Sequence, residues 1–446
     1  MRRGIELGSG VILLGAALSI AGPPDGQAEA REPVWAGAER VEVASGNAHR
    51  GPWRMNESDF DYIDDPTVAI AEDGHVGVAW ADLARQNIYF QMYGPDGEPR
   101  FAEPVDVSSH DGIFSWLPTL IIAPGDEPQV FALWQEIVFS GGSHGGEIFF
   151  ARSGDGGATF SGPVNLSNTI AGAGKGRLTA ERWDNGSLDL AMGPDGHLHA
   201  AWTEYEGRLW VRRSTDLGAT FEEPVHVAGD DARPARAPAL AVDGEGNVHL
   251  AWTVGEDAAA DIHVATATDG RSFGEPVIVA SNGHADAPRL AADADGRLHL
   301  VYGESPDGPF QEYRIRYAHR DPGDEGFSAP RTIVAPQGRL ESLNFPDLAL
   351  DGADNLHVVW QRYLDRRSRA RGLGFTLSSD RGQSFSEPEI VPGSDDAALG
   401  FNGGLQGSLM SRLAANGEGT LALVSSSFAP GRSSHVWLWL GSTAAR

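Results

Sequence analysis

Acidic side chains recur close behind a series of aromatic residues in this sequence. Five carboxylates and one arginine follow such an aromatic: Asp82, Glu136, Glu204, Glu256, Glu304 and Arg362. If the aromatics are equivalent positions of a repeated unit, these side chains lie at one level of the molecule. Carboxylates arranged in that way can bind a cation or a polyhydroxylated ligand, and two of them about 5 to 10 Å apart suffice for many glycosidases. Solvation of strand ends explains the same pattern, so both interpretations stay open.

Other residues of useful chemistry lie in the same predicted loops. Tyr205 stands between Glu204 and Glu206, which brings a phenol and a carboxylate together in the sequence. Adjacent residues of a strand point to opposite faces, so sequence neighbours need not be partners. Guanidinium groups suited to an anionic ligand, and aromatic rings suited to a sugar or a protein partner, are Arg182, Arg233, Arg236, Arg362, Trp116, Trp183 and Phe401.

The aromatics belong to an internal repeat. The pattern small-Leu-Ala-Val-Asp-x-x-Gly-x-Val-His-Leu-Ala-Trp occupies 239–252. Two close and four looser copies end at Tyr302, Trp360, Trp80, Trp134, Trp202 and, without an aromatic, Ser425. These anchors are 50 to 68 residues apart, a spacing typical of one propeller blade with loops of variable length.

Each repeat predicts four strands. The repeat itself reads as a hairpin, because alternating apolar residues flank a turn of Asp, Gly and Asn. A third apolar run follows in most copies, at 88–90, 148–150, 209–211 and 262–264. A proline then introduces a fourth run, which suits an edge strand because proline cannot donate a ladder hydrogen bond. These prolines are Pro104, Pro163, Pro224, Pro276, Pro330 and Pro388.

The two ends of the chain complement each other. The seventh copy has a third run at 436–440 and ends before a fourth, whereas 32–34 and 40–44 read as a fourth strand with no blade before it. We therefore expect the N-terminal strand to complete the last blade, which removes two open sheet edges. The predicted fold is all-β: a single β-propeller domain over 31–446 with seven four-stranded blades, six being the alternative count.

The turn between the third and fourth runs carries a short motif. Residues 153–160 and 214–221 read Ser-x-Asp-x-Gly-x-Thr-Phe, 378–385 has Ser for Thr, and 268–273 is shortened. Aspartate and hydroxyl oxygens can accept local backbone N–H groups, glycine permits positive φ, and the aromatic can pack into the blade. We interpret the motif as structural, with key residues Ser153, Asp155, Gly157, Ser214, Asp216, Gly218, Asp269, Ser378, Asp380 and Gly382.

These turns resemble the Asp boxes, or BNR repeats, of the sialidase superfamily. The resemblance implies a β-propeller glycosidase that holds the substrate carboxylate with an arginine cluster and uses a tyrosine paired with a glutamate as nucleophile. On this sequence the candidate catalytic residues are Tyr205, Glu204 and Glu136, and the candidate ligand-binding residues are Arg182, Arg233, Arg236, Arg362 and Trp183.

The sequence departs from the sialidase pattern in two respects. The Arg-Ile-Pro motif of an early strand is absent, and 59–65 reads Asp-Phe-Asp-Tyr-Ile-Asp-Asp instead. A count of seven blades also differs from the six typical of sialidases. The favoured interpretation is a propeller that binds carbohydrate or another surface ligand through loops on the face opposite the boxes. The alternatives are a glycoside hydrolase of the exo-α-sialidase type and a protein interaction platform.

Repeated histidines do not form a metal site. His199, His249, His299 and His357 each precede their aromatic by three residues. Equivalent positions in four blades are spread around an axis and cannot hold one ion, so we expect these side chains to pack within the blades. No cofactor is expected. Calcium would suit the oxygen ligands of 59–65, although no calcium-loop spacing occurs there.

Charge and targeting limit the partners. A formal net charge of −28 argues against nucleic acid and anionic membrane surfaces. Arg2 and Arg3, the apolar run 11–21 and the sequence Ala-Glu-Ala at 28–30 predict a signal peptide over 1–30, and hence a secreted or periplasmic protein. No segment is apolar for long enough to span a membrane, and the absence of cysteine excludes disulfides and thiolate sites.

Overall fold

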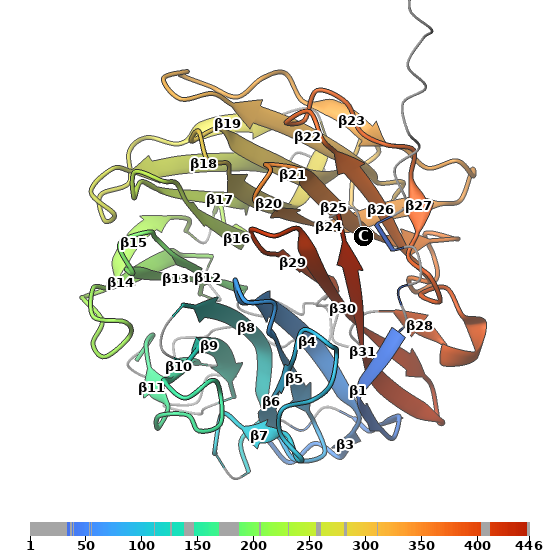
Figure 1. The fold of residues 1–446 in the computed structure, drawn as a ribbon. Coiled ribbons are helices and arrows are strands. Elements are labelled where there is room, and N and C mark those ends of the chain that lie inside the picture. Colours follow the sequence, from blue (N-terminus) through green and yellow to red (C-terminus); the bar gives the residue numbers. More distant parts are fainter. Residues whose placement is uncertain are drawn as a thin grey trace, which may run out of the picture. The chain divides into compact units, whose positions relative to one another are not determined.

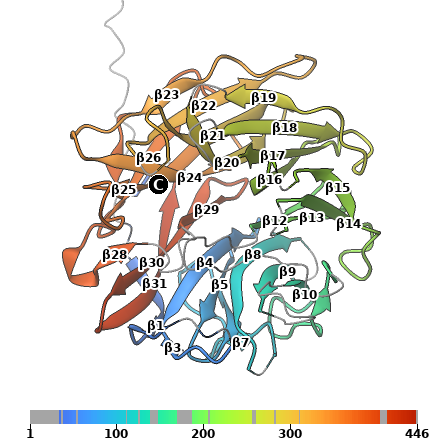
Figure 2. The same cartoon turned by 180° about the vertical axis from the view of Figure 1, so that it is seen from behind.

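The computed structural model describes residues 34–443 except 36, 37, 39, 53, 55, 111, 125, 126, 138–146, 169–186, 205, 206, 231, 256–259, 281, 282, 310 and 403–410. The compact unit that begins at Val34 is nearly all β. It contains seven four-stranded antiparallel blades around a common axis (Figure 1, and from behind in Figure 2). The predicted seven-bladed propeller is therefore confirmed. The predicted signal peptide lies outside the described residues and stays a prediction.

In six blades the four strands follow the chain from the axis outwards, and in the seventh the first three do so (Figure 1). The innermost strands are β4 (Ile63–Ile70), β8 (Ser115–Ala123), β12 (Leu188–Met192), β16 (Ala235–Val242), β20 (His284–Ala292), β24 (Ser342–Leu350) and β29 (Ser411–Ala415). The second strands are β5 (Val76–Asp82), β9 (Gln129–Glu136), β13 (Leu198–Thr203), β17 (Val248–Val254), β21 (Leu298–Ser305), β25 (Leu356–Tyr363) and β30 (Thr420–Ala429). We number the blades 1 to 7 in this order.

The third and fourth strands lie where the sequence predicts them. The third strands are β6 (Asn87–Tyr93), β10 (Glu147–Ser153), β14 (Leu209–Ser214), β18 (Asp261–Ala267), β22 (Arg314–Arg320), β26 (Leu373–Ser378) and β31 (Ser433–Ser442). The outermost strands of blades 1 to 6 are β7 (Val105–Asp106), β11 (Val164–Asn165), β15 (Val225–Ala228), β19 (Val277–Ala280), β23 (Arg331–Val334) and β27 (Glu389–Ile390). Each begins directly after, or close to, one of the six prolines.

The N-terminal strand closes the ring. Strand β1 (Arg40–Gly46) pairs antiparallel with β31, from Arg40 opposite Trp439 to Gly46 opposite Ser434. Val34 and Trp35 are buried in the core between blades 6 and 7. The smaller elements are β2 (His49–Arg50), which pairs with β3 (Phe60–Asp61), β28 (Phe401–Asn402), which pairs with β30, and a 3₁₀ turn, Ala397–Leu399. The predicted closure is confirmed.

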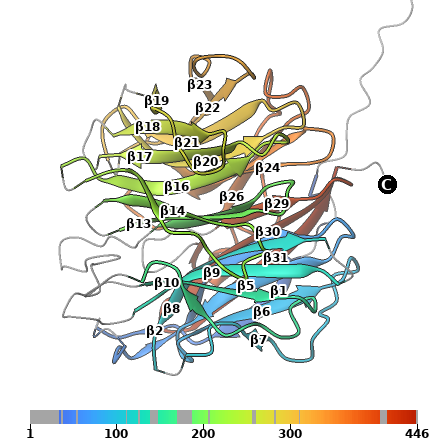
Figure 3. The same ribbon diagram turned by 90° about the vertical axis from the view of Figure 1, so that its left-hand side faces the viewer.

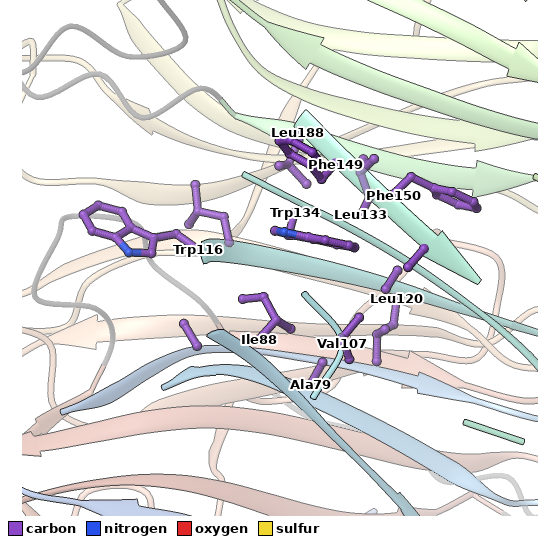
Figure 4. Close-up of a cluster of buried hydrophobic side chains, with 14 of the residues drawn as sticks. Ala79, Ile88, Val107, Trp116, Leu120, Leu133, Trp134, Phe149, Phe150 and Leu188 are labelled. Carbon is purple, nitrogen blue, oxygen red and sulfur yellow. The ribbon is translucent and has the colours of Figure 1, made fainter. Parts of the chain in front are cut away.

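The hydrophobic core lies between blades. One buried cluster joins blades 1, 2 and 3, and others join each later pair of neighbours as well as blade 7 to blade 1. Figure 4 shows the first cluster, in which the rings of Trp134 and Phe149 are stacked 6.3 Å apart. Strand side chains alternate between two faces, so each blade contributes to the core on both of its sides.

Five innermost strands share a bulge before a proline. Asp65, Leu117, Ala237, Ala287 and Phe345 have φ between 49° and 55°, and the pairing register shifts at each of them. A positive φ is unfavourable for these residue types, and the residue before proline prefers extended backbone. One residue of every innermost strand lies opposite the residue that precedes the anchor position, and in these five strands it follows the bulge.

The loops fall on two faces (Figure 3). The top face carries two kinds of loop: those that connect the second strand of a blade to its third, and those that connect the outermost strand to the next blade. The bottom face has the innermost hairpins and the turns between third and fourth strands. This division follows from the antiparallel order of the strands.

Candidate functional site

The polar side chains of the Asp-containing turns on the bottom face form hydrogen bonds within the turns themselves. Ser214 Oγ donates to Asp216 Oδ1 over 2.8 Å and accepts from Gly218 N over 2.9 Å. Thr220 donates through its N–H and its hydroxyl to the same carboxylate, and these bonds lower the pKa of Asp216 to about 2. Matching bonds occur around Ser153 and Asp155, and around Ser378 and Asp380. Asp269 accepts from two backbone N–H groups.

The aromatic of each complete turn packs against the preceding blade. Phe160 contacts Phe90 edge to face at 5.5 Å between ring centroids, and Phe221 contacts Phe150 at 5.0 Å. In blade 6, Phe385 contacts Tyr317 of blade 5 at 5.3 Å. The turns therefore fasten neighbouring blades together, and this packing accounts for the whole motif.

The repeated histidines are buried beside aspartates of the innermost hairpins. Nε2 of His249, His299 and His357 lies 3.1 to 3.2 Å from Asp243, Asp293 and Asp351 respectively. Each aspartate also accepts backbone N–H groups of its own turn. These pairs hold the bottom hairpins in shape, in agreement with the packing role expected from the sequence.

Three predicted site residues lie outside the described part of the chain. They are Tyr205, Arg182 and Trp183. Glu206 and Glu256 also lie outside it. Glu204 is half-buried in the turn between β13 and β14, where its N–H donates to Arg208 O over 2.7 Å.

The three described arginines of the predicted set are held separately. Arg236 donates from Nε and Nη2 to Gly255 O over 3.0 and 2.6 Å. Arg362 donates to Glu341 Oε1 over 3.2 Å, in blade 6. Arg233 is exposed. Arg236 and Arg362 are thus engaged by different partners in blades 4 and 6.

The carboxylates behind the anchor aromatics are also engaged within their own blades. Asp82 lies 3.6 Å from Arg85, and burial raises the pKa of Asp82. Glu304 lies 3.3 Å from Arg316. The distances are those of ion pairs within single blades, and a ligand shared by these carboxylates stays a prediction. Among the described residues, no three His, Cys, Asp or Glu side chains are grouped to hold a metal ion.

The acidic segment 59–65 is held by protein partners. Asp61 accepts from Asn47 over 2.6 Å, and Asp64 accepts from Ser426 Oγ over 2.7 Å. Asp65 is 2% exposed, and burial together with the neighbouring Asp64 raises its pKa well above the usual value. A carboxyl group that resists ionisation is a poor calcium ligand. Calcium at this segment stays an untested prediction.

Two aromatic residues that the sequence analysis expected to be exposed in the top loops are packed against other residues. Trp116 is 1% exposed, so the prediction that it lies in an exposed loop is wrong. It belongs to the innermost strand β8, and its ring lies in the core (Figure 4). Phe401 is half-buried against Phe428 and lies beneath the guanidinium of Arg369, 5.2 Å away.

A charged network crosses the axis at the level set by the bulges. Arg289 Nε lies 3.1 Å from Asp347, and Asp347 accepts from Leu413 N of the next blade over 2.8 Å. Asp189 likewise accepts from Leu240 N over 2.8 Å. Burial lowers the pKa of Arg412 to about 10. These charged groups connect neighbouring innermost strands, which gives them a structural role.

One imidazole–carboxylate pair on the top face differs from all of these. Glu136, at the end of β9, is 0% exposed and lies 2.6 Å from Nδ1 of His110, whose side chain is 34% exposed. Trp134 Nε1 donates to the other oxygen of Glu136 over 2.7 Å. The His110 ring also contacts Phe149 edge to face at 5.5 Å.

Burial raises the pKa of Glu136 above its usual value, and hydrogen bonds from His110 and Trp134 oppose part of this rise. When the carboxylate is ionised, His110 donates from Nδ1 and its Nε2 keeps a lone pair. Among the described residues Nε2 has no hydrogen-bond partner. A half-exposed imidazole oriented by a buried carboxylate is an arrangement suited to general base catalysis.

No sequence pattern identifies His110. Glu136 follows an anchor aromatic and was selected, but His110 lies in the connection from β7 to β8, outside the repeat. Connections between blades vary in length and sequence, so no periodicity singles out a residue there.

Comparisons with known proteins show the fold and no family. No protein-family model matches the chain, and no curated protein matches it. Among solved structures, a polysaccharide lyase described as an ulvan lyase is 13% identical, with a TM-score of 0.56 over 91% of this chain and 96% of its own. A second polysaccharide lyase is 10% identical, with a TM-score of 0.55 over 91% and 99%.

The solved structures of similar fold also include sialidases. One, from Streptococcus pneumoniae, is 10% identical with a TM-score of 0.47 over 72% of this chain and 68% of its own. The structural neighbours are therefore carbohydrate-active propellers of several kinds. At these identities the likeness concerns the fold alone.

Proposed function

We propose that this protein binds a polysaccharide across its top face and cleaves it, with His110 as the general base and Glu136 as the residue that positions it. The observation that carries the proposal is the contact of 2.6 Å between Glu136 and His110 Nδ1. It combines a buried carboxylate with a side chain that solvent and ligand can reach. The propeller face with the loops between blades is a usual place for ligands.

The roles of the two residues follow from their contacts. The Glu136 carboxylate fixes the imidazole tautomer with the proton on Nδ1 and stabilises the imidazolium that forms when Nε2 takes a proton. Trp134 and Phe149 surround the pair with apolar rings, which strengthens its electrostatic interaction. A proton taken by Nε2 would come from water in hydrolysis, or from a carbon next to a carboxylate in elimination.

Elimination fits the described residues better than hydrolysis by two carboxylates. The acidic residue opposite Glu136 in the sheet is Glu147, which is 3% exposed and accepts a hydrogen bond from Ser167. Among the described residues, no carboxylate other than the buried Glu136 forms an ion pair or hydrogen bond with His110. In elimination the base removes the carbon-bound proton, a C=C bond forms, and the glycosidic C–O bond breaks with its electrons on the leaving oxygen.

The fold is compatible with this proposal, because the two similar propellers described above are polysaccharide lyases. The exo-α-sialidase alternative draws no support from Arg233, Arg236 and Arg362, two of which are engaged in different blades. Binding without catalysis and a protein interaction platform are tested together with cleavage. The predicted signal peptide would place the protein outside the cytoplasm, where polysaccharides are met.

Cleavage assays with matched histidine variants test the proposal. The wild-type protein is incubated with neutral, uronate-containing and sulfated polysaccharides and with a sialoside, and reducing ends and the ultraviolet absorbance of unsaturated sugars are followed. We expect cleavage with a gain in absorbance. His110→Gln should lower kcat by about 10²–10⁴-fold, the usual contribution of a general base.

The control is His197→Gln on the bottom face. The His197 side chain is 31% exposed and lies 2.7 Å from Asp195, so it resembles His110 in exposure and pairing. It should leave kcat unchanged. Equal losses in the two histidine variants, or no cleavage of any polysaccharide by the wild-type protein, would overturn the proposal.

Glu136→Gln tests the positioning role. Removal of the carboxylate should lower kcat with little change in KM, because the imidazole then loses the partner that fixes its orientation and tautomer while the ligand-binding surface is kept. An unchanged kcat, or an equal change in KM alone, would show that Glu136 does not orient the base.

A further inference from the structure

Two neighbouring loops on the top face of blade 6 are rich in arginine. Together 335–341 and 362–372 contain six arginines and two carboxylates, Glu341 and Asp365, in a chain whose net charge is −28. The arginines are Arg339, Arg362, Arg366, Arg367, Arg369 and Arg371. We call these two segments the arginine loops. Their local excess of positive charge is opposite in sign to the rest of the molecule.

The backbone of the arginine loops is firmly held. Arg366 N donates to Leu340 O over 2.8 Å, which joins the two loops. Arg371 N donates to Arg362 O over 2.7 Å, and Gly372 N donates to Asn402 Oδ1 over 2.6 Å. The guanidinium groups therefore extend from an ordered backbone. An ordered backbone lowers the conformational entropy that the loops lose when a ligand binds.

Several of these guanidinium groups face solvent. Arg339, Arg367 and Arg369 are exposed. Among the described residues, the guanidinium groups of Arg339 and Arg367 have no hydrogen bond or ion pair, while the backbone N–H of Arg367 donates to Asp365 Oδ1 over 2.9 Å. The guanidinium of Arg369 lies over the Phe401 ring. Two exposed leucines, Leu340 at 41% and Leu364 at 52%, lie in the same loops.

We propose that the arginine loops bind the sulfate or carboxylate groups of an anionic polysaccharide that occupies the top face. This inference rests on the proposed function and names its substrate class. A guanidinium presents paired N–H donors that match the oxygens of a carboxylate or a sulfate. The exposed leucines offer apolar surface beside the charges, as the C–H faces of a sugar require.

The negative charge of the protein outside the arginine loops favours some polyanionic ligands over others. Charges more than about 8 Å away are largely screened at physiological salt, so a chain that lies on the arginine loops experiences mainly their positive field. A stiff, highly charged duplex would extend over acidic surface and be repelled. Flexible polysaccharides with separated anionic groups fit the small size of the patch better than nucleic acid does.

Binding measurements with a matched charge control test this inference. The probes are dextran sulfate, carboxymethyl dextran and neutral dextran of equal length, titrated onto the wild-type protein at low salt. The test variant is R367Q/R369Q. The control is R100Q/R271Q on the bottom face, which changes the net charge equally and removes two exposed ion pairs of little energetic value.

We expect dextran sulfate or carboxymethyl dextran to bind at least tenfold more tightly than neutral dextran. R367Q/R369Q should weaken that binding at least tenfold and make it less sensitive to salt, whereas R100Q/R271Q should change it less than twofold. Equal affinity for neutral dextran, equal losses in both variants, or tighter binding of duplex DNA than of dextran sulfate would overturn the inference.

Catalysis and charge recognition separate in the same experiment. His110→Gln should lower kcat by the same about 10²–10⁴-fold and leave binding of the anionic dextrans intact. If the wild-type protein cleaves only neutral polysaccharide in a way that depends on His110, the role of His110 as the base stands, whereas elimination and the anionic substrate class both fail. If it binds anionic dextran through Arg367 and Arg369 but cleaves nothing, the substrate class stands and the catalytic role of His110 fails.

Discussion

Two histidines of this propeller show how burial decides what an imidazole does. His110 is 34% exposed beside the buried Glu136 and can exchange protons with solvent. His299 is 0% exposed, with its nitrogens 2.8 Å from Tyr317 Oη and 3.2 Å from Asp293. Burial lowers the pKa of His299 to about 4. The first residue suits catalysis, and the second keeps its neutral form to hold a turn.

We expect the buried histidines to make the free energy of unfolding depend on pH. Burial lowers the pKa of His199 and of His299 to about 4 from 6.5, so between these values the unfolded chain binds protons that the folded chain does not. The contribution of these two histidines to the free energy of unfolding should therefore be largest above pH 6.5 and fall as the pH drops towards 4. Each group contributes at most roughly 1.4 kcal/mol per pH unit.

Urea denaturation between pH 7.5 and 4.5 measures this slope. His299→Gln should have a smaller slope than the wild-type protein, while His226→Gln, which changes an exposed histidine, should keep the wild-type slope. The lowered pKa of Asp293 acts below about pH 4 and lies outside this window. A wild-type slope in His299→Gln would contradict the assignment.

Among the elements, the Asp-containing turns bind each blade to the one before it. Gly382 has a φ of 81°, and a Cβ there would overlap the Tyr317 phenol of blade 5. Gly382→Ala should therefore lower the free energy of unfolding by about 2–4 kcal/mol, through backbone strain and overpacking. Thermal or urea denaturation measures the loss.

Gly154 provides the control for this substitution. It lies in the equivalent turn of blade 2, and a Cβ there would meet no atom within 4 Å. Gly154→Ala should leave stability within about 0.5 kcal/mol of the wild-type protein. Similar losses in the two variants would show that the turn does not act through contact with the preceding blade.

The strands were predictable because their signals are local. Proline before an outermost strand, a polar turn in a hairpin and an aromatic at a strand end each act within a few residues. Trp116 shows where such signals fail. The prediction placed it in an exposed top loop, whereas the bulge at Leu117 keeps the innermost strand continuous through Pro118.

Closure by β1 is the feature on which the whole molecule depends. Without β1, the ten-residue strand β31 would become an exposed edge, and Val34 and Trp35 would leave the core between blades 6 and 7. A protein that begins at Asn47 should no longer unfold in one cooperative transition. The free energy of unfolding that it loses should be comparable to the about 5–15 kcal/mol that stabilises most domains. Calorimetry measures this change.

A protein that begins at Arg31 is the control, because it lacks only the predicted signal peptide and keeps β1. It should unfold in one transition at the wild-type temperature. A cooperative transition of unchanged midpoint in the shorter protein would show that seven blades hold together without the N-terminal strand.

The fold of this protein followed from its sequence, and its candidate site did not. Repeats, turn motifs and unmatched chain ends recur along the chain, so they determined the blade count and the closure. Glu136 was selected by its place behind Trp134, but its partner His110 and the union of the two arginine loops come from connections without a repeat. Burial and contacts between segments distant in sequence decide which groups meet and which can reach solvent. Only the tertiary structure provides them.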